Sequence, residues 1–241
     1  MKTITIITDS LAMPRVEGDE KIYIQQTWPK LLAQQLGNDF MLAEFKERAR
    51  DTDSLRIDQL FFETITCCKP DILLLQIGIV DCAPRIISKQ ENALWNRRYF
   101  PKRLRQYLIQ RRKQNRANIL EKGPLKKVYV SPDQYEQNIK SFIQQVKASY
   151  PSTFILTLPI VGNFQQLEQK SKGYTANKDL YNDILQKVAD STDTLYAGAL
   201  LAYMQQDDFY TLDGYHLTVK GHTQVAHFLM ETFKTERVAR A

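Results

Sequence analysis

Short runs of branched and apolar residues alternate along this chain with longer segments that have the periodicity of helices. Five runs predict strands, the last of them more weakly: 3–9, 71–79, 153–160, 193–199 and 39–45. The segments between and after them predict helices at 27–37, 53–69, 131–151, 176–191 and 218–236. Nearly continuous apolar runs are typical of strands covered on both faces. The alternation therefore predicts an α/β fold with a parallel five-stranded sheet.

The segment at about 86–130 interrupts this alternation. It contains no strand pattern, and residues 100–122 predict one basic helix. The apolar contacts expected of that helix are Leu104, Tyr107 and Leu108, with Ile119 as a further candidate. We therefore expect a single domain over 1–241 that carries a basic helical insertion.

Charge is distributed unevenly between this insertion and the remainder of the chain. Residues 97–127 contain 12 Lys and Arg against Glu121 alone, a local charge of +11 within a total of +6. The remainder of the chain therefore has a net charge of −5. A solvated charged helix is the commonest form of such a run, and contact with an anionic glycan or a membrane surface is the next interpretation. Nucleic acid is the least favoured partner, because no RNA- or DNA-binding motif accompanies the basic residues.

The N-terminal apolar run is too short for a secretory signal, and Asp9 interrupts it. No stretch is long enough to span a bilayer, so the expected location is cytoplasmic. Cys67, Cys68 and Cys82 have neither a disulfide framework nor metal-site spacing, and we expect reduced, mostly buried thiols.

Three residues near the chain ends carry the candidate chemistry. Ser10 directly follows the first predicted strand, and Asp213 precedes His216 by three residues in a predicted loop. A serine hydroxyl becomes a good nucleophile when an imidazole accepts its proton, and a carboxylate orients that imidazole. The structural alternative is that Asp9 or Ser10 only caps a helical turn. His222 and His227 fall on the last predicted helix, where packing or surface roles are expected.

The order of these motifs resembles the SGNH hydrolase superfamily, the GDSL-type esterases. The matching blocks are Thr8-Asp9-Ser10, Gly78-Ile79-Val80-Asp81 and Asp213-Gly214-Tyr215-His216. The resemblance implies a three-layer α/β/α flavodoxin-like fold with strand order 2-1-3-4-5. It also implies Ser10 as nucleophile, His216 as general base and Asp213 as its partner, with no metal or organic cofactor.

The chain departs from the pattern of this superfamily at the expected oxyanion hole. Val80 stands where the third block has asparagine, which leaves Asp81 as the nearby polar side chain. An ionised Asp81 would repel an oxyanion, so it is expected to stay protonated, to point elsewhere or to bind substrate. The second block has no glycine in this chain, and a backbone amide near Arg50 or Asp51 is the expected substitute. Ser10 and Gly78 complete the residues assigned to this region.

Two arginines end the candidate loops, in Pro14-Arg15 and Pro84-Arg85. Guanidinium groups match carboxylates and phosphates, so Arg15 and Arg85 are candidate substrate-binding residues. The alternative is pairing with local acids. The sequence around Arg85 also resembles SGNH-like proteins associated with bacterial surface-polysaccharide biosynthesis.

The leading hypothesis is a serine esterase or deacylase that hydrolyses an acyl ester, acetyl being one candidate, on a small-molecule, glycan or anionic substrate. One alternative is an acyltransferase that uses the same triad. The other is a catalytically weak binding protein for an anionic glycan or a phosphate ligand.

Overall fold

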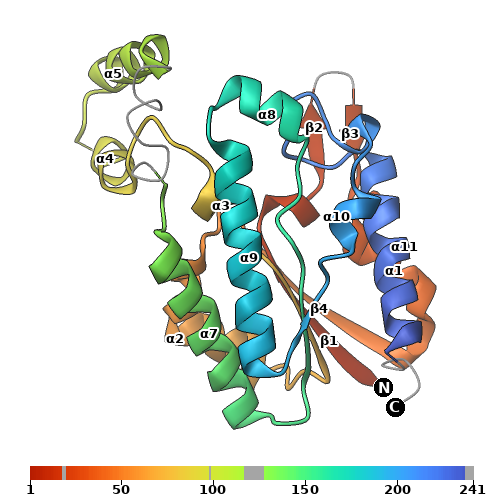
Figure 1. The fold of residues 1–241 in the computed structure, drawn as a ribbon. Coiled ribbons are helices and arrows are strands. Elements are labelled where there is room, and N and C mark those ends of the chain that lie inside the picture. The colour runs from red at the N-terminus through yellow and green to blue at the C-terminus, as the bar shows by residue number, and fades with distance from the viewer. Residues whose placement is uncertain (18–19, 98, 117–127, 237–241) are drawn as a thin grey trace.

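The computed structural model describes residues 1–17, 20–97, 99–116 and 128–236. Its centre is a parallel five-stranded sheet in the order β4-β1-β5-β6-β7, which confirms the predicted order 2-1-3-4-5 (Figure 1). The strands are β1 Lys2–Thr8, β4 Phe40–Lys46, β5 Ile72–Gln76, β6 Phe154–Thr157 and β7 Leu195–Tyr196.

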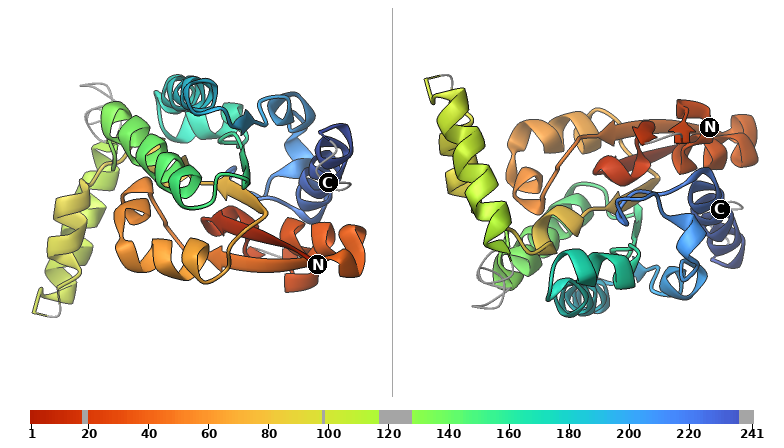
Figure 2. Two further views of the ribbon diagram at one scale, coloured as in Figure 1. Left: turned by 90° about the horizontal axis from the view of Figure 1, so that it is seen from below. Right: turned by 90° about the horizontal axis from the view of Figure 1, so that it is seen from above.

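Helices cover both faces of the sheet and form three layers (Figures 1 and 2). One face carries α1 Trp28–Leu36 and α11 Val219–Thr235, which pack against each other. The other face carries α2 Asp58–Phe61, α7 Pro132–Ser149 and α9 Tyr174–Thr192. Two covered faces explain the uninterrupted apolar runs, because side chains on both sides of a central strand are removed from water.

Burial follows the position of each strand in the sheet. All five residues of β5 are buried, as are the last five of β1, whereas β4 at the edge is mostly half-buried. The weaker apolar pattern at 39–45 therefore reflects an edge position. At the opposite edge, β7 has two residues, so the run predicted at 193–199 forms only a short strand.

Local sequence signals account for several helix ends. Pro132 occupies the first position of α7, and the Ser131 hydroxyl accepts from the Gln134 amide at 3.3 Å, as a cap at this position predicts. The helix predicted at 53–69 is broken instead. A 3₁₀ segment, Thr52–Arg56, is followed by an extended Ile57, then by α2 and a π-helical turn, Phe62–Thr66.

Several short elements have no counterpart in the predicted pattern. They are the β2–β3 hairpin, Arg15–Glu17 and Glu20–Ile22, and the helices α3 Ile79–Cys82, α8 Phe164–Lys170 and α10 Leu200–Tyr203. The 3₁₀ turns are Ser10–Ala12, Ile24–Gln26, Gly37–Asp39 and Asp207–Phe209. Most are too short for a periodicity to be recognised.

The predicted insertion projects from the body as α4 Lys89–Trp95 and α5 Lys102–Gln114 (Figures 1 and 2). The part of the predicted helix at 117–122 lies outside the described residues. Leu104 and Tyr107 are exposed, so their expected burial is wrong. The reason is that α5 contributes no buried residue and stands clear of the core, while Arg112 pairs with Glu91 of α4 at 2.6 Å.

Within the described part of the chain, no helix combines the length and the apolarity needed to cross a membrane. The three cysteines are free, but only Cys82 is buried; Cys67 is exposed and Cys68 is half-buried, which corrects the expectation of mostly buried thiols. Cys67 and Cys68 directly follow the π-helical turn after α2, at its exposed end.

We predict that Gly221→Ala destabilises the protein. Gly221 lies in the first turn of α11, where an added Cβ would stand 2.2 Å from the Phe209 carbonyl oxygen. Overpacking of this kind costs about 1–3 kcal/mol, which exceeds the gain of up to about 1 kcal/mol from replacing glycine in a helix. Denaturant unfolding measures the difference. Thr223→Ala, at an exposed position on the same helix, is the control and should leave stability nearly unchanged.

Candidate active site

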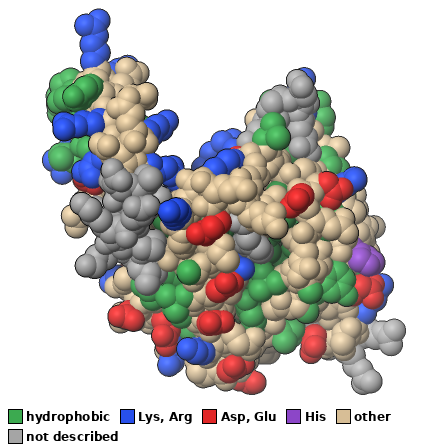
Figure 3. Space-filling model, turned by 45° about the horizontal axis from the view of Figure 1, so that its top comes forward, with side chains coloured by type: hydrophobic (Ala, Val, Ile, Leu, Met, Phe, Trp, Pro, Cys, Tyr) green, Lys and Arg blue, Asp and Glu red, His purple; other side chains and the backbone are tan. Residues whose placement is uncertain are grey.

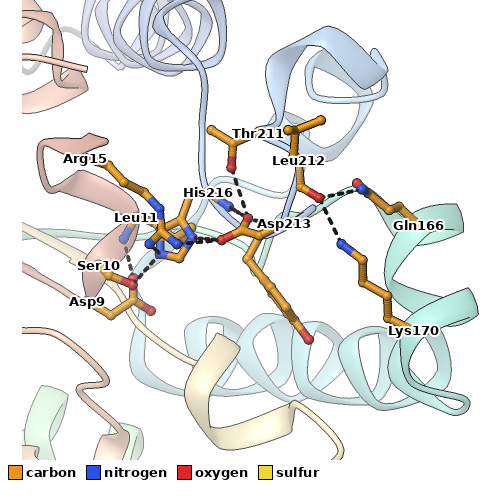
Figure 4. A network of polar contacts seen from close by, with 11 residues as sticks. Asp9, Ser10, Leu11, Arg15, Gln166, Lys170, Thr211, Leu212, Asp213 and His216 are labelled. Carbon is orange, nitrogen blue, oxygen red and sulfur yellow. Dashed lines mark hydrogen bonds and ion pairs between the residues drawn. The ribbon is translucent and has the colours of Figure 1, made fainter. Parts of the chain in front are cut away.

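The ends of the chain meet where the parallel strands finish. Ser10 follows β1, and His216 lies in the loop before α11. The Ser10 Oγ is 2.9 Å from His216 Nε2, and His216 Nδ1 is 2.5 Å from Asp213 Oδ2 (Figure 4). The structure therefore brings together all three residues assigned to a triad from the sequence.

Asp213 is oriented by the backbone of its own loop. Its Oδ1 accepts from the Tyr215 and His216 amides at 2.8 and 2.9 Å and from the Thr211 hydroxyl at 3.0 Å. Burial alone would raise the pKa of Asp213, but the bonds from His216 and Tyr215 outweigh it and hold this pKa well below its ordinary value. Asp213 is therefore a carboxylate that can fix the tautomer of His216.

The loop that carries Asp213 is held by α8, an element the sequence pattern did not predict. Gln166 and Lys170 both donate to the Leu212 carbonyl, at 2.6 and 2.9 Å (Figure 4). The backbone N–H of Asn163, just before α8, donates to the Gly214 carbonyl at 2.8 Å. Gly214 has φ +78°, a conformation that favours glycine, and it lets the chain turn between Asp213 and His216.

Ser10 begins a 3₁₀ turn that Asp9 caps, because Asp9 Oδ1 accepts from the Leu11 amide at 2.8 Å. The capping role and the position of Ser10 beside His216 thus coexist. Burial raises the pKa of Asp9 to about 7. Its Oδ2 has no partner among the described residues.

Arg15 contacts the triad directly. Its Nη1 lies 2.8 Å from His216 Nε2, and its Nη2 lies 2.9 Å from Asp213 Oδ2 (Figure 4). A guanidinium nitrogen can only donate, so it occupies the same ring nitrogen that must accept the Ser10 proton. Arg15 therefore pairs with a local acid, which is the alternative that the sequence left open.

A small pocket of about 190 Å³ opens over Ser10 and His216. Its other walls are mainly apolar: Leu11, Ala49, Ile79, Val80, Arg85 and Tyr215. Ala49 lies three residues after the end of β4. Its φ of +58° is the left-handed conformation for which glycine is the usual residue. The sequence predicted a substitute amide near Arg50 or Asp51, and Ala49 is the residue directly before Arg50. Ala49 itself was not singled out by the sequence pattern, although the end of β4 marked this loop.

Gly78 and Asp81 do not line this pocket. Gly78 has φ +138°, and a Cβ there would lie 2.6 Å from the Tyr135 hydroxyl, so close packing requires glycine. Asp81 is buried, and its Oδ1 accepts from the Thr52 amide and hydroxyl at 2.9 and 2.5 Å. Burial raises the pKa of Asp81 to about 7. Its side chain thus joins α3 to the segment that follows β4.

Arg85 lines the small pocket and also a larger neighbouring one, whereas Arg15 lines neither. The Arg85 guanidinium lies 4.7 Å from the centre of the Tyr129 ring, and its Nη2 donates to the Val80 carbonyl at 3.3 Å. The two arginines assigned to substrate therefore have different surroundings.

The remaining histidines lie outside the site. His222 is buried, and its Nδ1 accepts from the Trp28 amide at 3.2 Å at the start of α1. Burial, with a smaller contribution from His216, lowers the pKa of His222 to about 3, so it stays neutral. His227 is exposed on α11. These placements agree with the packing and surface roles expected of them.

Solved structures with similar folds include several esterases. The lipase/acylhydrolase from Enterococcus faecalis is 11% identical, with a TM-score of 0.64 over 98% of this chain and 97% of that chain. A catalytic mutant of Axe2, an acetylxylan esterase from Geobacillus stearothermophilus, is 17% identical, with a TM-score of 0.59 over 95% and 93%. The M. smegmatis aryl esterase is 19% identical, with a TM-score of 0.61 over 98% and 99%. At these identities the likeness shows the fold alone.

No curated protein matches the chain. A family model described as "GDSL-like Lipase/Acylhydrolase family" matches residues 17–224, which is most of the sequence. The matched range begins after Ser10, so the nucleophile block rests on the sequence motif and on the contact with His216. The chain belongs to the GDSL-like lipase/acylhydrolase family and is a serine hydrolase.

Proposed function

We propose that this chain hydrolyses a short acyl ester, acetyl first among them, on a carbohydrate or related anionic substrate. Ser10 is the nucleophile, His216 the general base and Asp213 the residue that orients it. The observation that carries the proposal is the continuous contact from Ser10 Oγ through both nitrogens of His216 to Asp213 Oδ2. The fold shared with an acetylxylan esterase supports the choice of an acetylated carbohydrate.

The reaction proceeds through an acyl-enzyme. His216 Nε2 accepts the Ser10 proton as Oγ attacks the ester carbonyl carbon, and Asp213 stabilises the imidazolium that forms. The tetrahedral intermediate collapses, and the alcohol leaves with the proton from His216. Water then gives a proton to His216 and attacks the acyl carbon. The carboxylic acid is released as the bond to Ser10 Oγ breaks, and His216 returns its proton to that oxygen.

Two backbone amides are suited to the oxyanion. Neither the Ser10 nor the Ala49 N–H donates to another residue in the described ranges, and both residues line the pocket. Val80 cannot supply the side-chain donor that asparagine supplies in the superfamily pattern, and loss of one donor costs about 10²–10³ in rate. We therefore infer a two-donor oxyanion hole and a slower chemical step.

The pocket over Ser10 limits the acyl group. Leu11, Ile79 and Val80 supply apolar walls, and the volume of about 190 Å³ lies below the range of roughly 300–1,000 Å³ found for drug-sized ligands. An acetyl or similarly short group fits this space. A long lipid chain would have to extend into solvent or into the neighbouring pocket.

Ser10→Ala and His216→Ala should each reduce hydrolysis of p-nitrophenyl acetate by roughly 10³-fold or more, because triad members act as a unit. A fluorophosphonate probe should label the native protein at Ser10 and fail to label the Ser10→Ala variant. His227→Ala removes an exposed histidine and is the matched control, expected to retain full activity. Labelling that persists without Ser10, or full activity without His216, would contradict the assigned roles.

Asp81→Asn should leave ester hydrolysis within about threefold of the native rate, because Asp81 faces Thr52 and not the pocket. It should also change the pH dependence of stability. The pKa of Asp81 rises from 3.8 to about 7 on folding, so the folded state holds a proton that the unfolded state releases. The stabilisation is complete below about pH 4 and is lost as the pH rises through about 7.

Unfolding measured at about pH 5 and about pH 8 should therefore show a smaller loss of stability in Asp81→Asn than in the native protein. Part of the loss remains, because Asp9 has a pKa raised in the same way. An unchanged pH profile would show that Asp81 does not hold this proton. A large rise in hydrolysis would show that its charge reaches the oxyanion.

Arg15→Met should accelerate hydrolysis of small neutral acetyl esters. The guanidinium competes with Ser10 for His216 Nε2 and opposes the positive charge that the imidazole acquires. Two unit charges about 4 Å apart in water interact by about 1 kcal/mol, so a gain of roughly fivefold in kcat is expected. Arg15→Lys keeps the charge and is the control. A loss of about tenfold or more in Arg15→Met would identify Arg15 as a residue that positions substrate.

A further inference from the structure

A second, larger pocket adjoins the one over Ser10. Its volume is about 510 Å³, and Arg85 and Tyr215 line both pockets. Asp213 also lines it, so the larger pocket reaches the triad from the side of its carboxylate. We call it the anion pocket, and the residues that concern its chemistry are Arg85, Arg116, Tyr129, Lys170, Asp213 and Tyr215.

The anion pocket carries an excess of positive charge. It contains three cationic side chains against one carboxylate, and that carboxylate already accepts from His216 and Arg15. Neither Arg85 nor Arg116 forms an ion pair with an acid of the described residues. The Nε atoms of both arginines are buried and have no hydrogen-bond partner there.

Such an arrangement favours the binding of an anionic group with several oxygens, such as a phosphate or a carboxylate. Removing a guanidinium donor from water without a partner costs free energy, which a bound phosphate or carboxylate recovers through charge-assisted hydrogen bonds. Lys170 adds an ammonium that donates to the Leu212 carbonyl at 2.9 Å and so stands at the rim of the pocket. Two planar donors and one point charge suit a group with several acceptor oxygens.

The aromatic walls indicate the kind of molecule to which this anionic group is attached. Tyr129 stacks under the Arg85 guanidinium, and the Tyr215 ring packs edge-on against Tyr174 with centroids 5.6 Å apart. Rigid aromatic walls with a few polar groups are typical of pockets that orient a small ligand. The volume accommodates a sugar ring together with its anionic substituent.

The insertion builds one side of the anion pocket. Arg116 follows α5, while Ile86, Ile87 and Tyr129 come from the segments that leave and re-enter the body. Figure 3 shows Lys and Arg side chains along the projecting arm and in the hollow between the arm and the body. The basic insertion therefore brings charge to the site beside Ser10, in addition to the charge it exposes to solvent.

We propose that the anion pocket binds a phosphate or carboxylate group on the alcohol part of the ester, so that the substrate is an acylated sugar phosphate or sugar acid. This inference rests on the proposed function, because it places the acyl group over Ser10 and the alcohol beside Asp213.

Isothermal titration of the native protein with glucose 6-phosphate, glucuronate and glucose tests this assignment. We expect the two anionic sugars to bind and glucose to bind at least about tenfold more weakly, and the tighter anion identifies the preferred oxyanion. Arg116→Gln and Arg85→Gln should each weaken anion binding by about tenfold. Arg111→Gln makes the same charge change at an exposed position of α5 and should leave binding unchanged.

Equal binding of glucose and the anionic sugars would overturn the proposal, as would a loss in Arg111→Gln equal to that in Arg116→Gln. The bound anion must also compete with substrate, so glucose 6-phosphate or glucuronate should raise the KM for an acetylated sugar of the same charge. Hydrolysis of p-nitrophenyl acetate needs no anionic group. If it persists while anionic sugars fail to bind, the anion pocket alone is refuted and the triad stands.

Discussion

The hydrogen bond between Ser10 and His216 joins residues 206 positions apart, and the site depends on the packing that allows it. Ser10 is placed by β1, the strand next to the edge strand β4, and His216 by a loop that enters α11 on one face. Because α11 packs on α1, and His222 of α11 accepts from the first amide of α1, the two chain ends are held in one orientation. Catalytic geometry is thus a consequence of the crossover topology.

Charge in the site is balanced around one carboxylate. One oxygen of Asp213 contacts the His216 ring, and the other accepts from the backbone amides of its own loop. Arg15 contacts both the His216 ring and the first of these oxygens. An ionised Asp213 favours the imidazolium, and the Arg15 guanidinium disfavours it. In the proposed reaction, the balance between these two charges decides how readily Ser10 gives its proton to His216.

Backbone geometry shapes the region that we propose for the oxyanion. Ala49 takes a left-handed conformation that costs an alanine free energy, which indicates that the surroundings enforce it. Asp81 accepts hydrogen bonds from Thr52 and so supports the segment that follows Ala49, from which we propose an oxyanion donor.

The hydrophobic periodicity of the chain predicted a parallel sheet covered on both faces, and short motifs supplied the three triad candidates, because both signals are local in the sequence. The strand order followed from the resemblance of those motifs to the SGNH superfamily. The sequence could not show that Ala49 takes a left-handed conformation beside Ser10, that Asp81 turns toward Thr52, or that Arg15 reaches His216. Those contacts depend on side-chain directions at the ends of separate strands, where residues distant in the sequence meet. The anion pocket is likewise a tertiary property, since Arg85 and Arg116 belong to segments that only the insertion brings together.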